Sequence, residues 1–141
     1  MPNLVATAET DIAADPHTVW TALTDPEQIE QYMFGSKVDT DWQVGSPITW
    51  SGEHEGKTYE DKGKVVEVAE DRRLVVTHYS PMSGQPDEPG SYHTLTYDLQ
   101  GKGRTTHLSL SQDNNGDEAE AERSKQNWQA MLGQLKELLE S

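Results

Sequence analysis

The chain has 141 residues, of which 33% are hydrophobic, and a formal net charge of -14 from 25 acidic and 11 basic side chains. This length predicts one domain spanning residues 1–141, with a hydrophobic core large enough to fold without cross-links. The absence of cysteine excludes disulfides and thiolate chemistry. The acidity disfavours nucleic acid and anionic membranes as partners; solubility explains it, with a salt-adapted source as the alternative.

The N-terminal region is expected to form one strand and two short helices. No basic segment followed by an apolar run opens the chain, and no stretch approaches membrane-spanning length, so we expect a cytoplasmic protein without a membrane span. Residues 4–12 alternate apolar or small side chains with polar ones, which is typical of a half-buried strand. Asp15-Pro16 and Asp25-Pro26 each place an N-cap acid before a proline at the first helical position, so each predicts a helix.

The middle of the chain, residues 36–111, has an alternating pattern that predicts six more strands. Gly-, Pro- and Asp-rich breaks separate these candidates, and no internal repeat or low-complexity linker divides them. With the first strand they give one seven-stranded antiparallel sheet. A sheet of this kind in front of one long helix is an α+β arrangement.

The register of the last three strands can be predicted from their turns. A tight turn at Gly101-Lys102 places Leu95 opposite Leu108, and a symmetric loop over residues 80–90 places His78 opposite His93. Both registers gather apolar side chains on one face of the sheet, as a correct register requires. In the preceding strand, Val66 and Val68, rather than Val65, are expected to point inward.

The C-terminal stretch, residues 117–140, predicts a long helix. Asn114-Asn115-Gly116 breaks the preceding strand, and Asp117 with Glu120 matches a capping box. One helical face carries an apolar stripe that needs a partner surface, and the inward face of the sheet supplies it. The stripe consists of Trp128, Met131, Leu132, Leu135, Leu138 and Leu139.

Four segments in order resemble one known family along nearly the whole chain. They are the run from Ala14 to Glu27, Asp41-Trp42-Gln43-Val44-Gly45, Gly63 to Val68 leading to Arg73-Leu74, and Asn127-Trp128 to Glu140. The chain is thereby similar to the activator of heat-shock-protein-90 ATPase homologue family, within the START and birch-pollen-allergen-like superfamily (SRPBCC). The resemblance implies a helix-grip fold, in which a curved seven-stranded sheet grips the C-terminal helix across a cavity for apolar small molecules.

The candidate ligand contacts are large or polar side chains expected around that cavity. Trp20 and Trp128 are expected mainly to fill the core, whereas tyrosines and Trp50 suit a half-wet wall. His78 and His93 alone are too few ligands for a zinc site, and the sequence contains no nucleophile or cofactor motif. We therefore assign no metal, cofactor or catalytic residue. The predicted contacts are Trp50, Tyr59, Val66, Val76, His78, His93, Leu95, Tyr97, Trp128 and Leu132.

Three functions follow as hypotheses. The first is binding of an apolar or amphipathic small molecule or lipid by a monomer or weak homodimer. The second, implied by the resemblance, is stimulation of a chaperone ATPase in a stress response. The third is a cyclase or hydrolase in which His78, His93 or Tyr97 moves protons around a positioned ring substrate. The loop over residues 80–90 is interpreted as a lid plugged by Met82, or else as a disordered loop tip.

Overall fold

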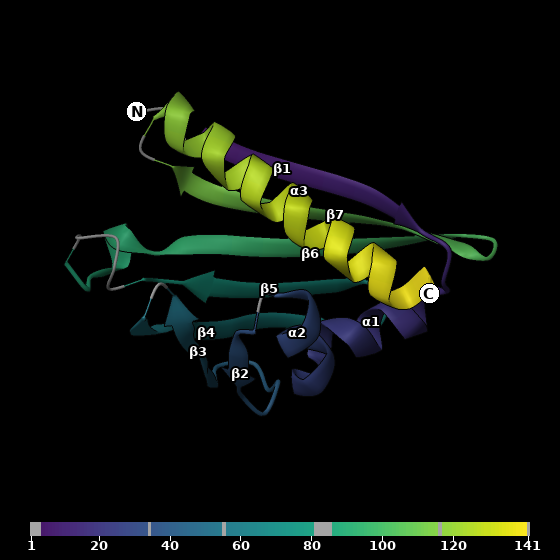
Figure 1. Ribbon diagram of the computed structural model, residues 1–141, viewed down its shortest axis with the longest axis horizontal. Coiled ribbons are helices and arrows are strands. Elements are labelled where there is room, and N and C mark those ends of the chain that lie inside the picture. Colours follow the sequence, from purple (N-terminus) through teal and green to yellow (C-terminus); the bar gives the residue numbers. More distant parts are fainter. Residues whose placement is uncertain (1–3, 34, 55, 81–85, 116, 141) are drawn as a thin grey trace.

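A seven-stranded antiparallel sheet and one long helix dominate the computed structural model, which describes residues 4–33, 35–54, 56–80, 86–115 and 117–140. The spatial order of the strands is β1-β7-β6-β5-β4-β3-β2. The sheet curves behind the long helix (Figure 1). The strands are β1 (Leu4–Ile12), β2 (Lys37–Asp39), β3 (Pro47–His54), β4 (Lys57–Ala69), β5 (Arg73–His78), β6 (His93–Lys102) and β7 (Thr105–Asn115).

The helices begin where the sequence places acidic caps. They are α1 (Pro16–Thr24), α2 (Pro26–Tyr32) and α3 (Glu118–Glu140), with a 3-10 turn, η2 (Pro89–Ser91), before β6. Oδ1 of Asp15 accepts from the Thr18 N–H at 2.8 Å, and Oδ1 of Asp25 accepts from the Glu27 N–H at 3.1 Å. Asp117 caps α3 in the same way. These bonds satisfy N–H groups that the first helical turn leaves without a partner, so the predicted starts are confirmed.

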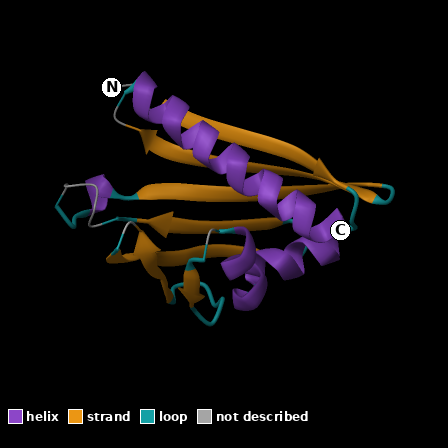
Figure 2. Ribbon diagram, in the orientation of Figure 1, coloured by secondary structure: helices purple, strands orange, loops and turns teal. Residues whose placement is uncertain are grey.

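The helices cover one face of the sheet (Figure 2). The helix α3 crosses that face diagonally, and its C-terminal end lies beside α1 (Figure 1). Its residues Met131, Leu132 and Leu135 are at most 1% exposed and join the inward side chains of the strands in one core. This arrangement confirms the predicted α+β helix-grip fold. None of the described helices is long and apolar enough to cross a membrane.

The prediction that Val66 points inward is wrong. Val65 is buried and pairs with Val76, whereas Val66 is 47% exposed. The cause is an irregularity of the β4–β5 pairing between Val65 and Glu67, where the strand gains one residue, as in a β-bulge. The bulge reverses the alternation, so Val68 again packs against the core, as predicted.

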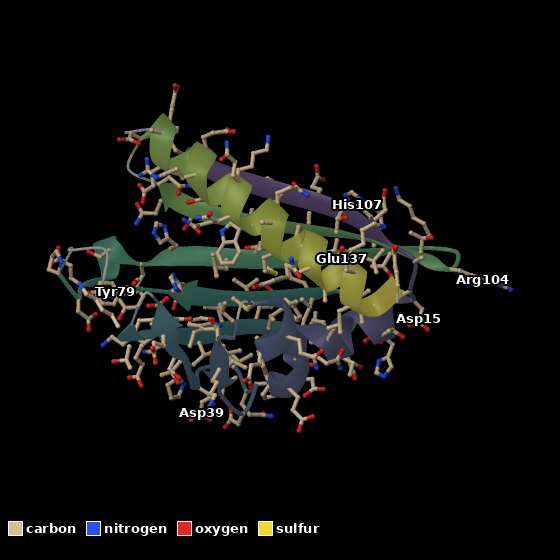
Figure 3. All side chains as sticks on the ribbon, in the orientation of Figure 1. Asp15, Asp39, Tyr79, Arg104, His107 and Glu137 are labelled. Atoms are coloured by element: carbon tan, nitrogen blue, oxygen red, sulfur yellow. The ribbon has the colours of Figure 1, made fainter. Side chains whose placement is uncertain are left out.

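The predicted register of β6 and β7 is also wrong, by four residues. Leu95 lies opposite Gln112, because the two-residue turn falls at Gly103-Arg104 and not at Gly101-Lys102. Gly103 has a φ of +66°, the left-handed conformation that such a turn needs at its first position. Arg104 marks the outer tip of this hairpin (Figure 3). A shift of four keeps the same face inward, and the predicted pairing of His78 with His93 is confirmed.

A small charged cluster joins β1 to β7 on the surface. The His107 ring places Nδ1 2.8 Å from Oδ1 of Asp11 and Nε2 3.1 Å from Oε1 of Glu9. Figure 3 shows His107 beside β1. Hydrogen bonds to these two carboxylates raise the pKa of His107 above its ordinary value. His107 therefore binds a proton more tightly in the folded protein than in the unfolded chain.

We expect the substitution His107→Gln to lower stability only at acidic to neutral pH. The raised pKa means that the contribution of His107 is fully present below the ordinary value of 6.5 and is lost as pH rises through the folded-state pKa. The effect should stay below about 1 kcal/mol, because the pairs are at the surface. Urea denaturation of both proteins across pH measures it, and a difference that does not change with pH would contradict this account.

Candidate functional site

A cavity of about 460 Å³ lies between the sheet and the N-terminal half of α3 (residues 118–128). Pockets that hold small ligands commonly have volumes of ~300–1,000 Å³. Five strands, α3 and the segment after α2 contribute to its wall. The lining residues are Met33, Ser36, Trp50, Glu53, Tyr59, Asp61, His78, Ser80, Leu95, Tyr97, Gln112, Ser124, Asn127 and Trp128.

Hydrogen bonds attach this half of α3 to β7. The indole N–H of Trp128 donates to Oε1 of Gln112 at 2.7 Å, and the Gln112 amide donates to Oγ of Ser124 and Oδ1 of Asn115, each at 3.1 Å. Asn115 in turn donates to the main-chain oxygen of Leu4 on β1. The buried amides Gln112 and Asn115 are therefore partnered, and they fix the helix above the cavity.

The most polar part of the wall is the pair formed by His78 on β5 and Asp61 on β4. Nε2 of His78 lies 2.9 Å from Oδ2 of Asp61, and the two side chains are 20% and 17% exposed. The ring of Trp50 meets the imidazole edge-on at 5.1 Å between centroids. Oδ1 of Asp61 and Nδ1 of His78 are buried and have no hydrogen-bond partner in the part of the chain that the structure describes. Such atoms are costly and often mark functional sites.

The close approach of β4 to β5 near this pair depends on Gly63. A Cβ atom at Gly63 would lie 1.7 Å from the main-chain oxygen of Thr77, a separation that no side chain tolerates. On either side, Lys62 pairs with Tyr79 through the backbone, and the Lys64 N–H donates to Oγ1 of Thr77. Glycine thus allows the contact between strands that places Asp61 beside His78.

Aromatic side chains form much of the remaining wall. Tyr59 and Ser36 are hydrogen-bonded through their hydroxyls. Burial raises the pKa of Tyr97 far above its ordinary value, so this phenol stays protonated at neutral pH and is a poor base. Together with the indoles of Trp50 and Trp128, these rings can contact a flat or apolar ligand.

The structure places the ten predicted ligand contacts in four environments. Six line the cavity: Trp50, Tyr59, His78, Leu95, Tyr97 and Trp128. Val76 and Leu132 are buried in the core, and Val66 is at the surface. His93 is partly buried, with Nδ1 2.8 Å from the main-chain oxygen of Asp113, and is not among the lining residues.

The prediction missed most of the polar wall. Gln112 could have been found, because it continues the alternation of Leu108 and Leu110 on the inward face of β7. Asp61 follows the predicted contact Tyr59 by two residues on β4, so alternation places it on the same face, but its contact with His78 depends on the close approach of β4 to β5 at Gly63. Asn127 has only a weak signal, its place one turn before Met131 of the apolar stripe.

Two other features of the prediction lie elsewhere. Met82, the predicted plug, falls outside the described residues, so the lid remains a prediction. In the described part of the loop over residues 80–90, Asp87 forms an ion pair with Lys62 on β4 and accepts a hydrogen bond from Tyr92. One group of potential metal ligands, His17, Glu70 and Asp71, lies near the surface, and none of the three lines the cavity.

A curved sheet holding a long C-terminal helix across a cavity defines the helix-grip class of proteins. Within it, residues 13–140 match the model of one family, the activator of Hsp90 ATPase homolog 1-like proteins. The chain belongs to this family. The match includes every strand except β1, and all three α-helices.

Solved structures share the fold over nearly the whole chain. The protein ChR145 from Cytophaga hutchinsonii is 44% identical, with a TM-score of 0.85 over 97% of this chain and 94% of that one. An Aha1 dimer from Colwellia psychrerythraea is 18% identical, with a TM-score of 0.73 over 99% and 96%. DynU16, a protein of the dynemicin biosynthetic locus, is 20% identical, with a TM-score of 0.82 over 99% of this chain and 48% of its own. No curated protein matches the sequence.

Proposed function

We propose that this protein binds a small amphipathic molecule in the cavity between the sheet and α3. The observation that carries the proposal is the composition of the wall, in which aromatic rings stand beside the pair of Asp61 and His78. A volume of about 460 Å³ suits a molecule of one to three rings. Apolar walls would supply affinity, and the few polar groups would fix the orientation of the ligand.

The substitution Asn127→Trp is expected to weaken binding at least tenfold. Asn127 is exposed at the wall of the cavity, so a large ring there would occupy space that a ligand needs. The dissociation constant of the neutral probe 2-(1-naphthyl)ethanol, measured by NMR titration, reports the effect. The matched control is Gln126→Trp, on the same helix but not among the lining residues. Equal binding by both variants and the unsubstituted protein would place the probe outside the cavity.

A second candidate function is acid–base catalysis on a bound ring. It is supported by the contact between His78 and Asp61, because a carboxylate that orients an imidazole is a common arrangement for proton transfer. His78 would be the base, and Tyr97 would be a hydrogen-bond donor. This candidate requires a substrate whose turnover is lost in His78→Gln while binding persists; turnover that is unchanged would eliminate it.

Family membership supports a further candidate, stimulation of a chaperone ATPase. Addition of the protein to a purified Hsp90 and measurement of ATP hydrolysis test it directly. A rate that stays at the basal level over a range of concentrations would exclude this activity for the chaperone used.

A further inference from the structure

The charge of the cavity wall narrows the class of ligand. Two carboxylates, Glu53 and Asp61, stand in the wall, and no lysine or arginine is among the described residues that line it. Lys62, the next residue along β4, is exposed and engages Asp87 outside the cavity. A ligand inside the cavity therefore meets two carboxyl groups and, among the described lining residues, no lysine or arginine.

The carboxyl group of Asp61 lies in a mostly buried position. Its side chain is 17% exposed, and its partner is the imidazole of His78. Oδ1 of Asp61 has no hydrogen-bond partner among the described residues. A cation close to this pair would lower the free energy of the buried carboxylate, and a second anion would raise it.

The aromatic part of the wall can contact a cation as well as an apolar ring. Trp50 already packs against the imidazole of the pair, so its indole lies next to the charged end of the cavity. Tyr59 on β4 and Trp128 on α3 add ring surfaces to the same wall. Indole and phenol faces attract ammonium groups and also pack against apolar ligand atoms.

We propose that the ligand class is an organic amine, with its ammonium group directed to Asp61 and Glu53 and an aromatic or apolar body lying along the rings. This inference rests on the proposed binding function and adds the sign of the ligand's charge. It disfavours fatty acids and other anionic amphiphiles, which would bring a carboxylate toward Asp61 with no lysine or arginine in the described wall.

Three probes of matched shape test the proposal: the amine 2-(1-naphthyl)ethylamine, the neutral alcohol 2-(1-naphthyl)ethanol, and the carboxylate of 1-naphthaleneacetic acid. Their dissociation constants are measured by NMR titration at one pH and one ionic strength. We expect the amine to bind at least about tenfold more tightly than the acid, with the alcohol between them. The substitution Asp61→Asn should weaken amine binding about tenfold and leave alcohol binding nearly unchanged.

The control Glu67→Gln removes the same charge from an exposed position on β4 that does not line the cavity, and amine binding should not change. If Asp61→Asn does not fold, Glu53→Gln at the exposed rim replaces it, with a smaller expected loss of about threefold. Binding of the acid as tight as that of the amine would overturn the amine proposal while leaving the cavity function intact. Failure of all three probes to bind would overturn both.

Discussion

The substitution Gly63→Ala is expected to destabilise the protein by about 3 kcal/mol, with partial loss of folding at physiological temperature. A Cβ atom at this position would lie 1.7 Å from the main-chain oxygen of Thr77, which is part of β5 and cannot rotate away as a side chain would. The strands must therefore separate, and the backbone pairing of Lys62 with Tyr79 is broken in the process. Urea denaturation followed by circular dichroism measures the loss.

The matched control is Gly133→Ala in α3, where nothing lies within 4 Å of the added Cβ. Alanine favours helix more than glycine does, so this variant should be more stable by about 0.5–1 kcal/mol. Opposite signs for the same chemical change would separate steric contact from backbone entropy. A Gly63→Ala variant of unchanged stability would show that β4 and β5 do not approach as closely as described.

The substitution Leu132→Ala is expected to cost about 2–5 kcal/mol. Leu132 is fully buried where the C-terminal half of α3 meets the sheet, so truncation leaves a space that the surrounding residues fill only in part. Because Leu132 does not line the cavity, the folded fraction should keep its affinity for the naphthyl alcohol. The exposed neighbour Gln134→Ala should change stability by less than about 0.5 kcal/mol.

A loss below about 1 kcal/mol for Leu132→Ala would contradict the role of the apolar stripe as the main attachment of α3. Reduced ligand affinity at unchanged stability would instead return Leu132 to the set of ligand contacts that the sequence predicted.

The sequence predicts the elements of this fold well because their signals are local. Proline after an acidic cap marks α1 and α2, and the spacing of Met131, Leu132 and Leu135 marks the buried face of α3. The sequence also predicts correctly which side chains of β6 and β7 face inward, even though the predicted register is wrong by four residues. A register shift by an even number of residues moves no side chain to the other face of the sheet, so the predicted inward-facing residues stay the same.

The errors and omissions come from features that alternation cannot predict. A single extra residue near Val66 reverses the inward and outward positions of β4, and nothing in the composition of that strand marks it. The same irregular strand brings Asp61 to His78 through a glycine, so the most polar part of the cavity wall depends on a contact between backbones. His78 was found from the strand pattern, whereas its partner was not.

The two halves of α3 are attached to the sheet by different forces. The C-terminal half is held by buried apolar side chains, and the half above the cavity is held largely by the amides of Gln112 and Asn115 with Ser124 and Trp128. Water can replace those hydrogen bonds when they break, but it cannot replace apolar contacts. Local opening of the first three turns of α3 is therefore expected to cost less free energy than opening of its C-terminal half.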